Sequence, residues 1–314
     1  MKRMKKLRHF VSIQDLTNKE ILRVLAQTKR LKSELKKRGR NKKLLDGKTL
    51  VMIFEKPSLR TRVSFEAGMT QLGGHAIYLA PSDIGLGKRE TIEDSSRVLS
   101  RMADIIMART FKHETVVELA NYASVPVING LSDLEHPCQI LADLLTINEK
   151  RGKLKGLKLA FIGDGENNVT HSLAIAAGIL GMDLAVAAPK GYWMLPKVSK
   201  LASKIAKENG GNILQTVDPK VAARAADVVY TDTWISMGDE RQEKKRLKVF
   251  KNYQVTNKLM ALAKKDAIFM HDMPAYRGKE VSADVIDGPK SVIIDQAENR
   301  LHAQKALICF LLGV

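Results

Sequence analysis

Residues 49–66 read TLVMIFEKPSLRTRVSFE, an apolar run that passes directly into the polar start of a helix. The run TLVMIFE at 49–55 predicts a strand that is covered on both faces. A helix is expected from Ser58, and Arg60 and Arg62 fall near its start. Because a helix start carries unpaired N–H groups and partial positive charge, this stretch predicts a receptor for a phosphate or a carboxylate.

The same alternation of short apolar runs and helical segments extends along the chain in both directions. Upstream, apolar residues at helical spacing predict a helix over 17–37, opened by a capping box of Thr17 and Glu20. Further strands are expected at 75–80, 104–109, 125–129, 157–163, 183–189, 212–217, 227–232 and 267–272. Helices are expected from 58, at 91–102, near 114, from 136, after 168, at 198–208, near 222, near 258 and at 297–312. Short strands separated by helices predict an α/β fold with parallel sheets.

A polar, glycine-containing segment at 149–156, EKRGKLKG, interrupts this alternation before it starts again. We therefore predict two domains, 1–150 and 151–314, each a parallel sheet flanked by helices. A chain of 314 residues with 45% hydrophobic residues has ample material for two such cores. We expect the last helix, about 297–312, to return to the first domain, since chain ends often lie close together.

The formal net charge of +18 raises the question of a polyanionic partner. The basic residues are scattered along the chain, and aromatic residues make up only 5% and are not interleaved with them. We therefore predict no nucleic-acid binding. No apolar run approaches the roughly 20 residues that a membrane helix needs, so we predict no membrane association either.

The two cysteines, Cys138 and Cys309, are far apart in the sequence and form no metal-binding spacing. A disulfide framework is therefore not expected, and a reducing cytoplasm is the predicted location. The capping box at Thr17 leaves no room for a signal or transit peptide ahead of it.

Polar residues that follow predicted strands are the first candidates for a site, because ligands of parallel sheets lie beyond the carboxyl ends of the strands. The arginines matter most, since guanidinium groups gathered round one point form a pocket for a dianion. For any single arginine, a surface ion pair remains the alternative. The set comprises Ser58, Arg60, Thr61, Arg62, Arg109, His136, Gln139, Asn167, Asn168, Asp232, Ser236, His271, Asp272 and Arg300.

Two motifs in this set combine groups that can bind a polar substrate. His136 and Gln139, three apart in HPCQ, share one face at a helix start and could bind a carbonyl or an amide. A purely structural histidine is the alternative. Asp232 follows a predicted strand and could hold an ammonium group or accept its proton, or else cap a helix.

The segment GDGENN at 163–168 matches a dinucleotide-binding fingerprint only in part. The position of its third glycine holds Asn168, and no acid clearly ends the next strand, so we predict no NAD binding. An asparagine pair at a helix start can instead hydrogen-bond the backbone groups of an amino acid.

Taken together, these motifs resemble the aspartate/ornithine carbamoyltransferase family, over about residues 10–312. SLRTR at 58–62 is similar to the family's Ser-Thr-Arg-Thr-Arg phosphate motif, and HPCQ at 136–139 to its His-Pro-x-Gln. HDMP at 271–274 is similar to its His-Cys-Leu-Pro. DTWISMG at 232–238 is similar to the Asp-x-x-x-Ser-Met-Gly loop that marks the ornithine branch. The four motifs, in their order along the chain, are together far more specific than any one alone.

The resemblance implies a carbamoyltransferase that moves the carbamoyl group of carbamoyl phosphate to the δ-amine of L-ornithine. The products would be L-citrulline and phosphate, a step of arginine biosynthesis or of a urea-cycle type. The resemblance also implies two α/β domains that close over the substrates, a homotrimer or a multiple of trimers, and no metal or organic cofactor.

Carried over residue by residue, the resemblance assigns three kinds of role. Carbamoyl phosphate would be bound by Ser58, Leu59, Arg60, Thr61, Arg109, His136, Gln139, Asp272, Met273 and Arg300. Ornithine would be bound by Asn168, Asp232, Ser236 and Met237. The catalytic residues would be Arg60, His136, Asp232 and Asp272.

Three residues depart from the family's motifs. Leu59 and Met273 replace a threonine and a leucine, and both are expected to act through the backbone. Asp272 stands where the family has a cysteine, near the approach of the substrate amine. A carboxylate can accept a hydrogen bond from that amine, but beside Asp232 it would also disfavour the free amine needed for attack. The alternatives are therefore a related acceptor, such as putrescine, acetylornithine or lysine, or a non-catalytic ligand-binding paralogue.

Overall fold

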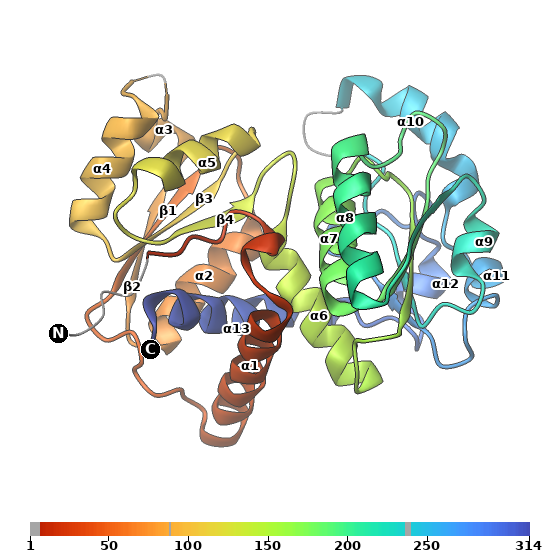
Figure 1. Cartoon of the computed structure of the whole chain (residues 1–314), viewed down its shortest axis with the longest axis horizontal. Coiled ribbons are helices and arrows are strands. Elements are labelled where there is room, and N and C mark those ends of the chain that lie inside the picture. Colours follow the sequence, from red (N-terminus) through yellow and green to blue (C-terminus); the bar gives the residue numbers. More distant parts are fainter. Residues whose placement is uncertain (1–6, 88, 236–239) are drawn as a thin grey trace. The chain divides into compact units, whose positions relative to one another are not determined.

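The computed structural model describes residues 7–87, 89–235 and 240–314 and divides into two compact units (Figure 1). Unit 1 comprises Met1–Leu145 with Asn299–Val314, and unit 2 comprises Thr146–Glu298. Each unit contains one parallel sheet with helices packed on it, which confirms the predicted α/β class. Both unit boundaries fall inside helices, α6 (Pro137–Arg151) and α13 (Ile293–Leu312).

The sheet of unit 1 has the strand order β2-β1-β3-β4, with every neighbouring pair parallel. The two central strands are buried almost throughout, as expected for parallel strands covered on both faces. The strands are β1 (Thr49–Phe54), β2 (His75–Leu79), β3 (Ile105–Arg109) and β4 (Val127–Leu131). The helices are α1 (Asn18–Arg38), α2 (Leu59–Gln71), α3 (Pro81–Ile84), α4 (Ile92–Met102) and α5 (His113–Tyr122), with the first part of α6 and most of α13.

The sheet of unit 2 has the strand order β7-β6-β5-β8-β9, again all parallel. The chain order reverses at β5, so the carboxyl ends of β5 and β8 mark the place where such sheets bind ligands. The strands are β5 (Lys158–Ile162), β6 (Asp183–Ala187), β7 (Ile213–Thr216), β8 (Val228–Tyr230) and β9 (Ile268–Met270). The helices are α7 (Asn168–Leu180), α8 (Pro196–Asn209), α9 (Pro219–Ala223), α10 (Glu243–Phe250), α11 (Asn257–Met260) and α12 (Ala283–Ile286).

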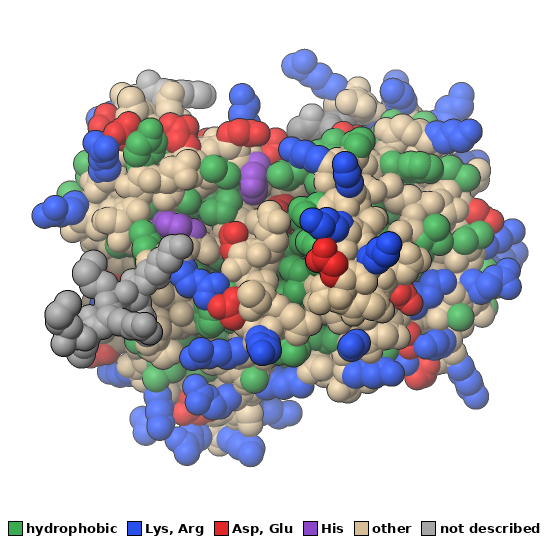
Figure 2. All heavy atoms as spheres, in the orientation of Figure 1, with side chains coloured by type: hydrophobic (Ala, Val, Ile, Leu, Met, Phe, Trp, Pro, Cys, Tyr) green, Lys and Arg blue, Asp and Glu red, His purple; other side chains and the backbone are tan. Residues whose placement is uncertain are grey.

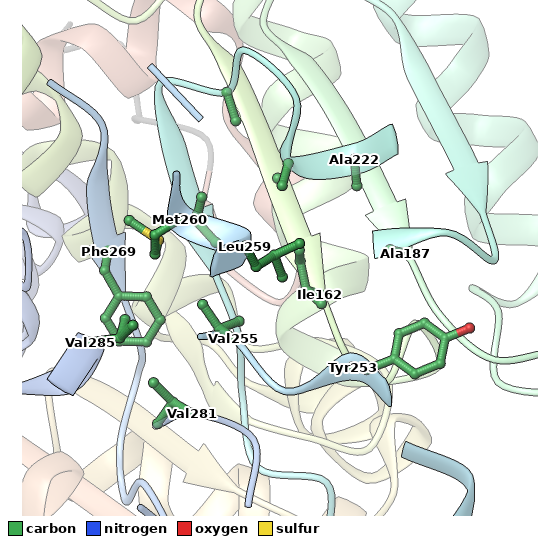
Figure 3. Packing of buried hydrophobic residues seen from close by; sticks show 14 of the residues in the cluster. Ile162, Ala187, Ala222, Tyr253, Val255, Leu259, Met260, Phe269, Val281 and Val285 are labelled. Atoms are coloured by element: carbon green, nitrogen blue, oxygen red, sulfur yellow. The ribbon is translucent and has the colours of Figure 1, made fainter. Parts of the chain in front are cut away.

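A hydrophobic cluster fills one face of the unit 2 sheet (Figure 3). Ile162 of β5 and Phe269 of β9 have no exposed surface and pack with Leu259 and Met260 of α11 and with Val285 of α12. Burial of side chains of this size contributes about 1.5–3 kcal/mol each. The cluster therefore fixes the short helices of unit 2 against its strands.

α13 returns to unit 1, as predicted, and begins at Ile293 rather than at position 297. Lys305 on this helix has no exposed surface, and its Nζ donates to Asn41 Oδ1 at 2.8 Å and to Gln71 Oε1 at 2.7 Å. Lys32 of α1 donates to Asn299 Oδ1 at 2.7 Å. These bonds tie α13 to α1 and α2, because Gln71 ends α2 and Asn41 lies just after α1.

Some short helices are absent from the predicted pattern. α3 and α12 span four residues each, which is one turn and too short to show a helical period. α10 follows the polar segment after residue 239 and carries mostly charged residues, so its apolar period is weak. The longer elements appear close to their predicted positions, and α1 has the predicted capping box of Thr17 and Glu20.

The surface carries its charge without one dominant patch on the face shown in Figure 2. Lys and Arg side chains are spread over this face, with Asp and Glu among them. Among the described helices, none has a stretch long and apolar enough to cross a bilayer.

Candidate active site

The carboxyl end of β1 leads into the capped start of α2. The Ser58 side chain accepts the Thr61 N–H at 3.4 Å, and its hydroxyl donates to Thr61 Oγ1 at 3.1 Å. Both hydroxyls therefore lie at the end of α2 that carries unpaired N–H groups. Leu59 is 74% exposed, so its side chain contributes little packing and only its backbone is held at this position.

Three helices of unit 1 meet at Arg300. Its Nη1 donates to Gln139 Oε1 at 2.6 Å, and its Nη2 donates to Thr61 Oγ1 at 3.1 Å. Gln139 Nε2 donates in turn to Asp143 Oδ1 at 2.9 Å. Since Arg300, Gln139 and Thr61 come from α13, α6 and α2 and are all at least 97% buried, the network fixes the three helix segments around one point.

His136 lies within the field of four cations. Its imidazole is 3% exposed, and burial is the main reason that its pKa falls well below 6.5. The positive charges of Arg300, Arg109, Lys56 and Arg60 lower this pKa further. A charge shifts a pKa appreciably only at close range. The four cations therefore lie near His136, although they come from α13, β3, α2 and the segment after β1. The imidazole is therefore neutral, and the potential around it is positive.

Carboxylates near this cluster are engaged by backbone amides. Glu55 Oε2 accepts the Phe111 N–H at 2.6 Å, and Asp133 Oδ1 accepts the His113 N–H at 2.8 Å. These bonds position the loop after β3 and the loop after β4. The arrangement as a whole favours an anion at the carboxyl edge of the unit 1 sheet.

In unit 2, the polar residues after β5 and β8 contact each other. Asn167 caps α7 by accepting the Val169 N–H at 2.6 Å, and its Nδ2 donates to Asp232 Oδ2 at 2.5 Å. Asp232 Oδ1 accepts the Thr233 N–H at 2.6 Å, and the side chain is largely buried. Asn167, rather than Asn168, thus makes the contact with Asp232, while Asn168 is the first residue of α7.

Asp232, His271 and Asp272 form a compact polar group, with one side-chain ligand atom from each within 4.8 Å of the others. His271 Nδ1 accepts the Met273 N–H at 2.9 Å, so its hydrogen resides on Nε2, which faces Glu280 Oε1 at 3.3 Å. Both ring nitrogens are occupied by these contacts. Two neighbouring carboxylates with an occupied histidine suit an ammonium group better than a metal ion.

A buried ion pair holds the segments on either side of Asp232. Arg246 Nη1 lies 2.7 Å from Asp164 Oδ2 and also donates to the Trp234 carbonyl at 3.1 Å. Burial raises the pKa of the Asp164 carboxyl, and the Arg246 charge opposes that rise. Removing one member would leave an uncompensated buried charge, so the pair fixes the loops after β5 and β8.

The structure leaves part of the predicted ornithine set outside the described residues. Ser236 and Met237 lie in the segment 236–239, which is outside the described ranges.

Met273 has a φ of +60° and precedes a cis peptide bond to Pro274. A positive φ at a methionine is uncommon, which agrees with a role for its backbone rather than its side chain.

Two further residues, Lys56 and Glu280, belong to these two clusters but are absent from the predicted candidates. Lys56 is a buried lysine directly before Pro57, and the sequence does not distinguish it from the many surface lysines. Asn167 is among the predicted candidates as the first of two asparagines after a strand, but the family resemblance assigns it no role. His271 is also among the predicted candidates and begins the HDMP motif, whereas Glu280 has no sequence signal, because only the fold brings it to His271.

Two family models match the chain. The carbamoyl-P binding domain of aspartate/ornithine carbamoyltransferase matches residues 8–149, and the Asp/Orn binding domain of the same family matches residues 155–311. The chain therefore belongs to the aspartate/ornithine carbamoyltransferase family, as its motifs predict.

Relatives place the similarity within the ornithine branch. The chain is 54% identical to an ornithine carbamoyltransferase of Caldicellulosiruptor saccharolyticus, over 97% of this chain and 98% of the relative. It is 53% identical to an anabolic ornithine carbamoyltransferase of Pyrococcus furiosus, over 98% of this chain and 96% of the relative. The solved structure of ornithine carbamoyltransferase from Pyrococcus furiosus superposes with a TM-score of 0.94, covering 98% of this chain and 97% of that one.

We predict that the neutral His136 makes the protein less stable in acid. The pKa of His136 is lowered in the folded protein, so below pH 6.5 the unfolded chain binds the proton more readily. The free energy of unfolding therefore decreases as the pH is lowered. The expected loss is about 1.4 kcal/mol per pH unit for one group, until the folded pKa is reached. Urea unfolding of the wild type and His136→Asn between pH 7 and pH 5.5 measures it. Equal pH slopes for the two proteins would contradict the prediction.

Proposed function

We propose that this protein transfers the carbamoyl group of carbamoyl phosphate to the δ-amine of L-ornithine, giving L-citrulline and phosphate. The observation that carries the proposal is the gathering of Arg60, Arg109 and Arg300 around the neutral His136. This cluster lies in the part of the chain that matches a carbamoyl-P binding domain. Relatives of more than 50% identity bear the name of this activity.

Carbamoyl phosphate occupies the positive cluster of unit 1 in this proposal. Its phosphate group binds the start of α2, where the Ser58 and Thr61 hydroxyls and the Leu59 N–H lie, and pairs with Arg60 and Arg109. Its carbamoyl end faces His136 and Gln139, with Arg300 holding Gln139 in place. The family resemblance also assigns the backbone of Asp272 and Met273 to carbamoyl phosphate.

Ornithine is held by the polar residues of unit 2 in this proposal. Asn168 at the start of α7 and the Ser236-Met237 segment bind its α-amino and carboxylate groups. Asp232 and Asp272 hold the δ-ammonium, since two carboxylates close together attract a cation. Asn167 orients Asp232 by donating to one of its oxygens.

The chemistry requires a neutral amine to attack the carbamoyl carbon. The new N–C bond forms as the C–O bond to phosphate breaks, and the amine proton passes by way of Asp232 or Asp272 to phosphate or solvent. A neutral His136 can donate a hydrogen bond to the carbamoyl oxygen as it becomes negative, while Arg60 supplies charge. Arg60 and Arg109 stabilise the departing phosphate.

The assembly and location belong to the proposal as well. We place the protein in the cytoplasm, as a homotrimer or a multiple of trimers, acting in arginine biosynthesis without a metal or organic cofactor. The anabolic relative from Pyrococcus furiosus supports the biosynthetic assignment.

The acceptor is tested by measuring product formation from carbamoyl phosphate with different amines. We expect citrulline to form with L-ornithine, and turnover with putrescine, acetylornithine and lysine to be at least about tenfold slower, because the ornithine set also binds the α-amino acid end. Faster turnover of another amine would show that this amine, and not L-ornithine, is the preferred acceptor. Phosphate binding without turnover of any amine would indicate a non-catalytic ligand-binding paralogue.

Arg60 and Arg62 form a matched pair on α2. Arg62 is exposed, ion-paired with Glu66 at 2.9 Å and stacked over the Tyr78 ring at 3.9 Å. We expect Arg60→Ala to lower kcat/KM for carbamoyl phosphate by about 10²-fold or more, because it removes a positive charge that stabilises the transition state. Arg62→Ala should stay within about threefold of the wild type. Initial rates of citrulline formation decide, and equal losses in the two variants would remove the assignment.

Asp272 is expected to control the pH profile. With Asp232 beside it, the substrate ammonium is stabilised, so little free amine is present at neutral pH. We expect Asp272→Asn to move the acid limb of kcat with ornithine to lower pH by about one unit, because the bound ammonium then loses its proton more readily, and Asp272→Cys to do the same. Rate-versus-pH profiles of the three proteins provide the measurement. Unchanged profiles in both variants would exclude a role for this carboxylate.

A further inference from the structure

We propose that Lys56 belongs to the anion site of unit 1 and takes up a proton when a phosphate dianion binds there. The inference rests on the proposed function, because it assigns a regulatory property to the same carbamoyl phosphate site. Its consequence is an affinity for phosphate ligands that depends on pH in the range just above neutrality.

The side chain of Lys56 is buried close to the start of α2. Its side chain is 8% exposed and follows β1, two residues before the Ser58 cap of α2. Its Nζ lies 5.1 Å from the centre of the Phe111 ring, an interaction that holds the ammonium without neutralising it. Among residues 7–87, 89–235 and 240–314, no carboxylate forms an ion pair with this group.

Each of the two acids that attract Lys56 has one oxygen engaged by a backbone amide. Glu55 accepts the Phe111 N–H at 2.6 Å, and Asp133 accepts the His113 N–H at 2.8 Å. A buried lysine is normally paired, because an isolated ammonium loses its hydration. Lys56 therefore has the character of a group whose counterion arrives with a ligand.

Charges from every neighbouring element act on this part of the site. Glu55 at the end of β1, Arg109 of β3 and Asp133 before α6 act on Lys56 directly, and Lys56 acts on His136. Arg60 of α2 and Arg300 of α13 complete the cluster around His136. Arginines do not lose their protons in proteins, and His136 is already neutral, so Lys56 is the group in this cluster that can titrate near neutrality.

The pKa of Lys56 is lowered in the unliganded protein, as proton uptake on binding requires. Burial is the main cause, and the Arg109 charge the next, of a Lys56 pKa lowered from 10.5 to about 8. A phosphate dianion placed among these residues reverses the local potential, which favours the ammonium form. Binding therefore raises the Lys56 pKa and draws a proton from solvent when the pH is above 8.

The experiment is calorimetric titration of the full-length protein with inorganic phosphate at pH 8.5, repeated in buffers of different ionisation enthalpy. About three quarters of unliganded Lys56 is neutral at this pH, so we expect uptake of ~0.7 proton per site. Lys56→Arg carries a permanent charge, so it should bind phosphate with almost no uptake. The wild-type Kd should rise about fivefold between pH 8 and pH 9, while that of Lys56→Arg stays nearly constant.

Two further variants separate this role from simple charge. Lys56→Met should weaken phosphate binding at pH 7 by about tenfold or more and abolish the proton uptake. Lys112→Met removes an exposed lysine that follows Phe111, and it should bind phosphate and take up protons as the wild type does.

The outcomes distinguish the inference from the function on which it rests. Uptake that is equal in the wild type and Lys56→Arg would overturn the role of Lys56, while the proposed transferase would stand. Wild-type protein that binds no phosphate but forms citrulline would also overturn it. Absence of both phosphate binding and citrulline formation would remove the proposed function and the inference together.

Discussion

Repulsion between like charges is the constraint on which unit 1 depends. Arg60, Arg109, Arg300 and Lys56 act together on one buried imidazole, and each added cation raises the free energy of the unliganded fold. Such a cluster persists only if rigid elements hold it. β1 and β3 lie adjacent in the sheet with Phe54 opposite Arg109, so the strands that end at this cluster are in fixed register.

The packing of α13 supplies the remaining support. Lys305 is itself a buried cation, and its amide acceptors at Asn41 and Gln71 stabilise it without adding negative charge to the unit. Arg300 lies further toward the start of the same helix, so the bonds that hold Lys305 also fix where Arg300 points. Unit 2 has the opposite character around Asp232 and Asp272, where carboxylates gather near the ends of β8 and β9. One unit is suited to an anion and the other to a cation.

Much of this could be read from the sequence, and the remainder has definite physical reasons. Strands such as β1 and β5 are short, apolar and bounded by turn residues, so local pattern identifies them. The motif residues at the ends of these strands were identifiable for the same reason, because a strand end is a local property. α3 and α12 were not, since one helical turn has no period.

The features of the site that the sequence does not show depend on three-dimensional contacts. Glu280 meets His271 only because the chain turns back after Met273, and no spacing rule contains that distance. Asn167 and Asn168 are chemically identical neighbours, and only the start of α7 decides which of them faces Asp232. Lys56 looked like an ordinary surface lysine among 52 basic residues, and its burial became visible only in three dimensions.

Because unit 1 is built from two separated stretches of sequence, the ribosome completes it late. The sheet of unit 1 is synthesised before residue 146, whereas Arg300 and Lys305 emerge only after the whole of unit 2 has been made. A nascent or truncated chain that stops before α13 therefore lacks a cation of the anion site and leaves the apolar surface beneath that helix uncovered. Incomplete products therefore expose the kind of surface that chaperones and proteases detect.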